Sequence, residues 1–402
     1  MKWVCPRVIR GNRGDLLSRQ GILQALLARG EQDVAVFALT DAHVPAALRP
    51  VLPYGPLYNL VPPPPGRQAL RRADTVLWTG GLDLQDDSSL AKLVHTLAVF
   101  SSYRLLGLRI IAVMQGAGPL TTTAGRWLTR QILNRMDVFI ARDPKTLALL
   151  AALRPRCQLV LAHDGIFAGD PLAEPLSARE AERVQHLVGA ETRPVIGFNL
   201  RLWFHFASSL LPYQFVKWRY RARSEDRMRR LIDAAQAVIG ELRHTHRARI
   251  ILLSMYEPGV EPWEDDLPYL ERVKQSFAAD SDVQIAGAPL SLRAFAELIR
   301  RLDLVVGMRL HSALAAIRLG VPAVHLAYTL KGHDIFAALG LADYVVAVEQ
   351  FLQTPSVLSG VVTRALSQPG LRNQIQHLAD RTTRENERVF QGVLDCCLRE
   401  KH

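Results

Sequence analysis

Arg309 and His311 follow a short apolar run, Leu304 to Val306, that is typical of a buried strand. They stand where a helical pattern begins, and the first turn of a helix offers unpaired N–H groups and a positive dipole end to anions. A guanidinium group binds phosphate or carboxylate through two parallel hydrogen bonds, and histidine exchanges protons near neutral pH. An isolated pair of this kind is more often a local ion pair and a helix cap. The position after a buried strand favours an anion-binding site.

Arg201 ends the first strand pattern of the second half of the chain, in the segment GFNLRLWF. If this strand is parallel to the one before Arg309, the two arginines emerge at the same edge of the sheet. Two guanidinium groups at one edge suit a ligand with two anionic groups. Lys331 lies in a basic loop after the next predicted strand and could reach the same place, although a loop lysine is more often only solvated.

The first half of the chain has further candidates, each at the end of a predicted strand. The turn GNRGD, which contains Asn12 and Asp15, resembles a phosphate-binding turn but matches neither the P-loop nor the dinucleotide fingerprint. Asp15 is expected to cap the next helix or to hydrogen-bond a polyhydroxylated substrate. His163 and Asp164 could form an acid–base pair or a satisfied structural pair. Glycine turns allow close backbone approach to a ligand at two positions, Gly81 and Gly116.

Composition sets the outer limits on function. The chain has 402 residues, is 49% hydrophobic and carries a formal charge of +11, with Arg far in excess of Lys. It lacks the basic tract or aromatic-interleaved patch of a nucleic-acid binder, and no His, Cys, Asp or Glu group has metal-ligand spacing, so we expect neither nucleic acid nor metal. Four cysteines without CxxC spacing and the absence of a long apolar segment predict a cytoplasmic protein. The basic charge leaves contact with the inner face of the membrane open.

Short apolar runs alternate with helical patterns along the whole chain, which predicts parallel sheets with crossover helices. We therefore expect an α/β protein with two doubly wound, Rossmann-like domains facing each other across a cleft. The predicted parts are an N-terminal domain (1–172), an interdomain crossing (173–193), a C-terminal domain (194–370) and a final helix (371–402) that could pack back on the first domain. The predicted strands are Trp3 to Ile9, Val34 to Phe37, Thr75 to Trp78, Arg109 to Met114, Val138 to Ile140, Gln158 to Leu161, Val195 to Leu200, Ile250 to Ser254, Val283 to Ile285, Leu304 to Val306, Ala323 to Leu326 and Tyr344 to Val348.

These strand-end residues together resemble the motifs of the polysaccharide pyruvyl transferase family. The resemblance rests on short motifs in a fixed order: Asn12 to Asp15, Gly80-Gly81, Gly116 to Pro119, Ala141 to Asp143, Asp164, Arg201, Gly307 to His311, Gly320 to Pro322 and Tyr328 to Lys331. It implies a GT-B-like fold and transfer of pyruvate from phosphoenolpyruvate to a sugar as a cyclic ketal. It also implies that the first domain holds the acceptor and the second the donor, and that no further cofactor is needed.

Carried over by position, the resemblance implies that Arg201, Arg309 and His311 contact phosphoenolpyruvate and that Leu310 contributes backbone. Thr329 departs from the family pattern, in which an acidic or amide residue often follows the tyrosine that Tyr328 matches. A further histidine used by some members is left with two candidates, His163 and His205.

The residues themselves agree with this chemistry, because phosphoenolpyruvate carries a carboxylate and a phosphate that two arginines would hold. His311 or a nearby histidine would transfer the proton. The acceptor sugar, and whether it is linked to a lipid, stay open. The main alternative is a GT-B glycosyltransferase that uses a nucleotide sugar, although Ser312 to Leu319 contains no acid to hold a ribose. A second alternative is a non-catalytic basic protein that binds polyanions.

Overall fold

The N-terminal half folds around a parallel sheet of seven strands in the order β3-β2-β1-β4-β5-β6-β7. The computed structural model describes residues 1–52, 62–81, 84–87, 89–190, 193–203, 218–260, 264–286 and 290–399. All pairings in this sheet are parallel, and most of its strands are continuously buried because helices cover both faces. The strands are β1 (Trp3–Cys5), β2 (Val34–Phe37), β3 (Arg49–Val51), β4 (Thr75–Trp78), β5 (Arg109–Gln115), β6 (Val138–Ala141) and β7 (Gln158–Leu161).

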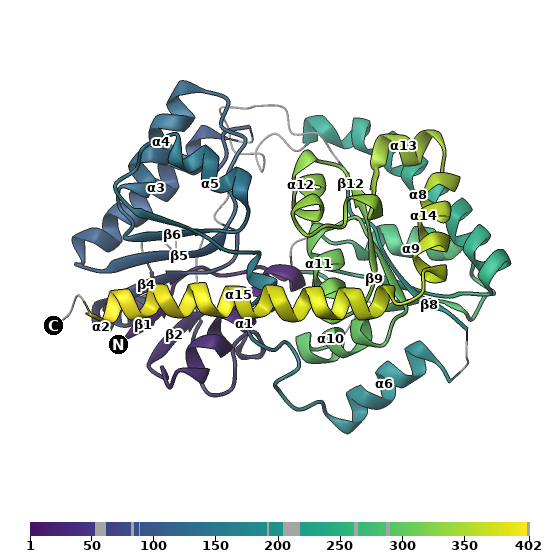
Figure 1. Ribbon diagram of the computed structural model, residues 1–402, viewed down its shortest axis with the longest axis horizontal. Coiled ribbons are helices and arrows are strands. Elements are labelled where there is room, and N and C mark those ends of the chain that lie inside the picture. Colours follow the sequence, from purple (N-terminus) through teal and green to yellow (C-terminus); the bar gives the residue numbers. More distant parts are fainter. Residues whose placement is uncertain are drawn as a thin grey trace.

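The C-terminal half repeats the plan with a six-stranded parallel sheet in the order β10-β9-β8-β11-β12-β13. Its strands are β8 (Val195–Asn199), β9 (Arg249–Leu253), β10 (Val283–Ala286), β11 (Leu304–Gly307), β12 (Ala323–Ala327) and β13 (Val345–Ala347). Figure 1 shows the two sheets side by side, each enclosed by its own helices. The predicted fold class, two doubly wound α/β domains, is confirmed.

Every predicted strand is present, and the differences from the prediction have local causes. β1 ends at Cys5 and not at Ile9, because Pro6 has no N–H to continue the ladder. β3 was not predicted. It has only three residues, with Pro50 in the middle, and lies at the edge of the sheet, where a proline is tolerated.

Helices of the first domain form one layer on each face of its sheet. One face packs against α2 (Pro64–Arg72), α3 (Leu90–Leu105), α4 (Thr123–Leu133) and α5 (Pro144–Ala151). The other face packs against α1 (Arg13–Ala28) and the end of the last helix. The crossing helix is α6 (Ala178–Val188), and the helices of the second domain are α8 (Trp218–His246), α9 (Leu267–Gln275), α10 (Leu292–Arg300), α11 (Leu310–Arg318), α12 (Leu330–Ala338), α13 (Val348–Gln353) and α14 (Ser356–Ser367). Single 3-10 turns are η1 (Asp41–His43) and η2 (Gly165–Phe167) in the first domain and η3 (Ala342–Tyr344) in the second.

The last helix, α15 (Leu371–Arg399), runs across both domains (Figure 1). Near its start, Leu371 and Ile375 belong to the core of the second domain. Near its end, Phe390 and Leu394 belong to the core of the first domain. The crossing between the domains contains α6, which packs on α10 of the second domain. One helix thus holds the two sheets in a fixed relation.

Both sheets have a point where the order of strands reverses, between β1 and β4 in the first and between β8 and β11 in the second. Helices leave the two strands of such a pair on opposite faces, and a crevice opens at their carboxyl ends. The sequence candidates Asn12, Gly81, Arg201 and Arg309 follow these four strands. The four candidates therefore lie at the carboxyl edges of the two sheets, beside the points where the strand order reverses.

Candidate functional site

Arg309 is fixed by the end of the strand that precedes it. Gly307 ends β11, and a Cβ atom there would lie 2.3 Å from the Ser312 hydroxyl, so the tight turn into α11 requires glycine. The Arg309 backbone N–H donates to Asn199 Oδ1 at the end of β8 (3.0 Å). The Asn199 amide in turn donates to the Leu253 carbonyl of β9 (2.9 Å). One buried asparagine thus ties three strand ends together beneath the arginine.

The Arg309 side chain is buried between two acids. Its guanidinium group donates to both carboxylate oxygens of Asp266 at 2.8–3.0 Å and to the Glu264 carboxylate at 3.2 Å. Asp266 is fully buried. Burial lowers the pKa of Arg309, but the Asp266 carboxylate and then Glu264 outweigh it and raise the pKa above its ordinary value. Arg309 is therefore a charged group held rigidly in an ion pair.

Arg201 reaches the same acid from β8. It donates to Glu264 at 3.2 Å and to the Tyr328 hydroxyl at 2.6 Å, and its guanidinium group lies 5.0 Å from the centre of the Tyr328 ring. Arg201 and Arg309, the arginine pair, thus converge on one Glu264 carboxylate. The sequence predicted the convergence of two arginines, but not that acids would already be bound to both. The sequence feature that could have predicted these acidic partners is a run of three acids, Glu264 to Asp266.

Tyr256 links the arginine pair to the first domain. Its ring lies 4.6 Å beneath the Arg309 guanidinium group, and its backbone forms an isolated bridge with Asn12. Burial, and then the nearby Glu264, raise the pKa of Tyr256. Asp15 also raises it, while the positive charges of Arg309 and Arg201 lower it. Sequence reasoning missed this residue, because a tyrosine in a loop carries no positional signal without the fold.

His311 lies where the two domains touch. Its Nδ1 is 3.4 Å from Asp15 Oδ1, and its Nε2 is 3.5 Å from Asp164 Oδ2, so carboxylates of the first domain face both ring nitrogens. Burial lowers the pKa of His311, but Asp164 and then Asp15 outweigh it and raise the pKa above 6.5. The two carboxylates thereby favour the protonated form of the histidine.

Arg142 completes this group from the end of β6. It donates to Asp164 Oδ2 at 3.1 Å. Burial would raise the pKa of Asp164, but His311 and then Arg142 hold it well below its usual range. A Cβ atom on Gly116 would lie 2.7 Å from the Arg142 guanidinium group. Gly116 therefore makes room for Arg142 and does not itself face an open site. His311, Asp15, Asp164 and Arg142 form the histidine cluster.

The turn before α1 differs from its prediction in one respect. Asn12, and not Asp15, caps the helix, because its side chain accepts from the N–H groups of Gly14 and Asp15. Asp15 lies in the first turn, with its carboxylate toward His311. A Cβ atom on Gly14 would lie 2.3 Å from the His311 Cβ, so the first turns of α1 and α11 pack in direct contact.

Other candidates fall outside these two groups. The His163 imidazole pairs with Glu385 of α15 at 2.7 Å, so it serves the packing of that helix. Lys331 lies in the first turn of α12 and not in a loop, since the segment after β12 is helical. Leu310 begins α11 and packs partly buried on the core. Gly81 follows β4 at the crevice, and His205 lies outside the described residues.

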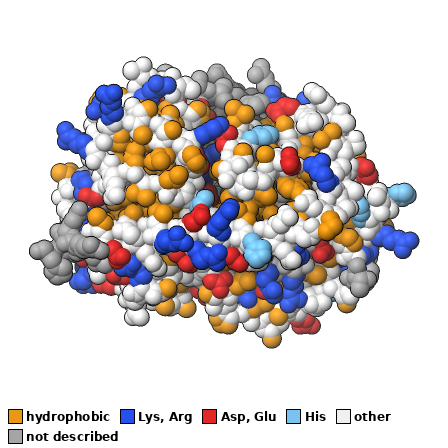
Figure 2. All heavy atoms as spheres, in the orientation of Figure 1, with side chains coloured by type: hydrophobic (Ala, Val, Ile, Leu, Met, Phe, Trp, Pro, Cys, Tyr) orange, Lys and Arg blue, Asp and Glu red, His pale blue; other side chains and the backbone are white. Residues whose placement is uncertain are grey.

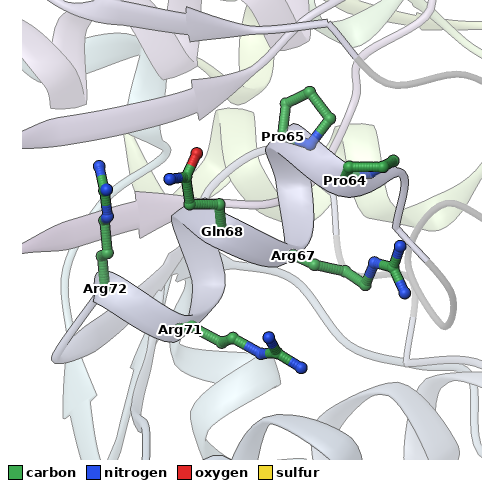
Figure 3. A pocket seen from close by; sticks show the side chains of 6 residues that line it. All are labelled: Pro64, Pro65, Arg67, Gln68, Arg71 and Arg72. Atoms are coloured by element: carbon green, nitrogen blue, oxygen red, sulfur yellow. The ribbon is translucent and has the colours of Figure 1, made fainter.

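A depression against α2 is separate from both groups. Its lining comes from a single helix of the first domain, shown in Figure 3: Pro64, Pro65, Arg67, Gln68, Arg71 and Arg72. None of these residues belongs to the arginine pair or the histidine cluster. The depression therefore shares no residue with the groups at the domain boundary.

A sequence model of one enzyme family, the polysaccharide pyruvyl transferases, matches residues 12–329. The match covers most of the chain and includes the arginine pair and the whole histidine cluster. The chain belongs to this family. It is therefore a transferase, of a family whose activity is pyruvyl transfer to polysaccharide.

Solved structures similar to this pyruvyl transferase share its architecture. UDP-GlcNAc 2-epimerase from Neisseria meningitidis, bound to UDP-GlcNAc, has 11% identity and a TM-score of 0.60, with 99% of this chain and 100% of that chain covered. Anabaena Alr3699/HepE, in complex with UDP and glucose, has 13% identity and a TM-score of 0.56, with 99% of each chain covered. These likenesses establish a GT-B fold and nothing finer.

A comparison with curated proteins found no match. Across the described residues, none of the helices combines the length and the apolar character that a membrane crossing requires.

Proposed function

We propose that this pyruvyl transferase takes phosphoenolpyruvate as its donor and binds it at the arginine pair. The observation that carries the proposal is the sharing of one carboxylate, that of Glu264, by Arg201 and Arg309, each at 3.2 Å. That carboxylate marks a position where an anion is held by guanidinium groups from two strand ends. The donor's carboxylate or phosphate would replace it there, while Asp266 keeps Arg309 in place.

His311 is the proposed general acid. Two carboxylates raise its pKa and so favour its protonated form, which would deliver a proton to the methylene carbon of the donor. This protonation leaves an oxocarbenium-like centre at C2. An acceptor hydroxyl attacks C2 and gives up its proton, for which the Asp15 carboxylate of the first domain is the proposed base. The guanidinium groups stabilise negative charge on the phosphate.

Ketal closure follows from the same arrangement. A second hydroxyl of the sugar forms a new bond to C2 as the bond from C2 to the phosphate oxygen breaks. Inorganic phosphate leaves with the electron pair, and the second hydroxyl proton passes to a base or to the phosphate. The overall change is one donor plus one diol to one cyclic ketal plus phosphate.

Mass spectrometry of oligosaccharides incubated with phosphoenolpyruvate and the protein tests the proposal. The expected result is a pyruvyl ketal on the sugar with one phosphate released for each ketal formed. Phosphate release without a change in the sugar, or a modified sugar without phosphate release, would reject it. The Arg201→Ala variant supplies the matched control, since it should lose both products together.

The rival donor is a nucleotide sugar, because the similar solved structures include proteins bound to UDP-GlcNAc or UDP. Arg318, the one charged side chain in the part of α11 that follows the first turn, donates to the Gly169 carbonyl of the first domain. Arg318 therefore bonds the two domains to each other. Thermal melts with phosphoenolpyruvate and with UDP-GlcNAc separate the two donors, because a ligand raises the Tm of a protein that binds it. A shift with UDP-GlcNAc alone would favour the rival.

A further inference from the structure

Positive charge is concentrated in one stretch of the first domain. Residues 88–163 contain ten Lys and Arg but only two Asp, a formal charge of +8 out of +11 for the whole chain. Asp137 is bound to Arg104 at 2.9 Å, and Asp143 caps α5 from a buried position. Acids from outside the stretch bind two of its basic side chains, Asp164 binding Arg142 and Asp334 binding Lys145, and the stretch still carries a large excess of positive charge.

The three helices of this stretch, α3, α4 and α5, lie on the same outer face of the sheet. Their sequences contain no Asp or Glu at all. Exposed basic side chains project from each of them: Lys92 from α3, Arg126 and Arg130 from α4, and Lys145 from α5. Lys145 is paired with Asp334 of α12, while the helices of the face contribute basic and no acidic side chains, so the face attracts a negatively charged surface.

Large apolar side chains are exposed on the same helices. Val94 of α3 is 53% exposed and Trp127 of α4 is 58% exposed, while Leu105 and Leu106 at the far end of α3 are 88% and 49% exposed. Val94 and Trp127 are each the fifth residue of their helix, and the two helices pack side by side. Figure 2 shows hydrophobic side chains gathered on this domain with Lys and Arg around them.

Val94 and Trp127, the apolar pair, lie at the end of their helices that adjoins the domain boundary. α3 follows β4 and α4 follows β5, so both helices begin at the carboxyl edge of the sheet, where the crevice opens. The buried Asp86 carboxylate accepts N–H bonds from Thr121 and Thr122 and fixes the start of α4 to the loop before α3. The apolar pair and the crevice thus share one edge of the molecule.

We propose that the α3–α4–α5 face docks on an anionic lipid bilayer and holds the crevice beside the membrane. Basic side chains draw the face to anionic headgroups, and the apolar side chains, with tryptophan among them, insert at the interface. A nucleic acid would use the charge but leave the apolar side chains in water. This inference rests on the proposed function and adds to it. An acceptor sugar carried by a membrane lipid would reach the arginine pair of a protein docked in this way.

Flotation with vesicles tests the docking without donor or acceptor, so its outcome is independent of the proposed reaction. The full chain should bind vesicles that contain phosphatidylglycerol and not vesicles of phosphatidylcholine alone. Arg126→Glu with Arg130→Glu should reduce binding about tenfold or more, and Trp127→Ala should also reduce it. The matched control is Arg179→Glu with Arg388→Glu, on α6 and α15, which should bind as the unaltered chain does.

Three results would overturn the docking proposal. They are equal binding to both kinds of vesicle, equal losses in the test and control variants, and tighter binding to duplex DNA than to anionic vesicles with the same dependence on Arg126 and Arg130. Far-ultraviolet circular dichroism melts of each variant establish that it is folded before vesicle binding is compared.

Discussion

At the residue scale, the two arginines of the pair have different environments and so different roles. Arg309 is locked to the buried Asp266, and its position is set by the fold. Arg201 has 14% of its side chain exposed and contacts Glu264 and Tyr328. Substitution of either should strongly reduce activity, but only the loss of Arg309 should also lower stability.

Arg309→Ala should lower the free energy of unfolding by about 3–5 kcal/mol, because it leaves the Asp266 charge buried without its partner. Arg201→Ala should change stability by about 1 kcal/mol or less and still reduce kcat by about 100-fold or more. Denaturant unfolding and phosphate release measure the two effects. Equal stability losses in both variants would contradict the division of roles.

Glu264 should compete with the donor for the arginine pair. Removing its charge in Glu264→Gln should tighten phosphoenolpyruvate binding about 2- to 10-fold, since two guanidinium groups lose a carboxylate partner. Calorimetric titration measures the Kd. The control is Asp265→Asn, which makes the same charge change on a carboxylate that accepts backbone N–H bonds from Gly259 and Leu267. Weaker binding in Glu264→Gln would show that the acid itself holds the donor.

The pH dependence should follow His311. Its pKa is raised in the folded protein, so the protonated form and the activity that needs it persist below that pKa and are lost as the pH rises through it. Asp164→Asn removes the largest of the causes that raise the pKa and should move the alkaline limb of the kcat/KM profile to lower pH. Asp15→Asn removes a smaller cause and should move it less. An unchanged limb in both variants would remove His311 as the acid.

At the element scale, the first turns of α1 and α11 meet with no room for a side chain between them. A methyl group on Gly14 would overlap His311, and Asp15 follows directly in the same turn. The packing of two helices from different domains therefore sets the distance between the acid of one and the carboxylate of the other. Gly14 is therefore needed for the close packing of the two helices and for the short distance between Asp15 and His311.

Gly14→Ala should lower both Tm and kcat, because the added Cβ would lie 2.3 Å from the His311 Cβ and must push the two helices apart. The matched control is Gly360→Ala within α14, where an added Cβ meets no atom within 4 Å and alanine favours the helix. The control should keep its activity and its Tm. Full activity in Gly14→Ala would show that the site tolerates a wider separation.

At the scale of the whole molecule, the two domains share their stabilising contacts. The core of the second domain includes Leu16, Ile166 and Phe167 of the first, and α15 contributes to the cores of both. The histidine cluster also takes its members from both domains. The site therefore exists only when the domains are assembled.

Calorimetric unfolding should show one cooperative transition, since neither domain can lose its packing without exposing apolar surface of the other. The comparison of the calorimetric and van't Hoff enthalpies measures this cooperativity. Two separate transitions would contradict the shared core. In that case α15 would stabilise one domain far more than the other.

The sequence by itself determined the two-domain fold and most of its strands, because buried parallel strands are continuous apolar runs that end in glycine or polar residues. It also pointed to Arg201, Arg309 and His311, since each follows such a run. The tertiary structure decided which side chains face them. Asp266, Glu264 and Tyr256 come from the loop after β9, and Asp164 and Arg142 come from the other domain. Contacts between segments so distant along the chain depend on how sheets and helices pack, and no local pattern of residues encodes that packing.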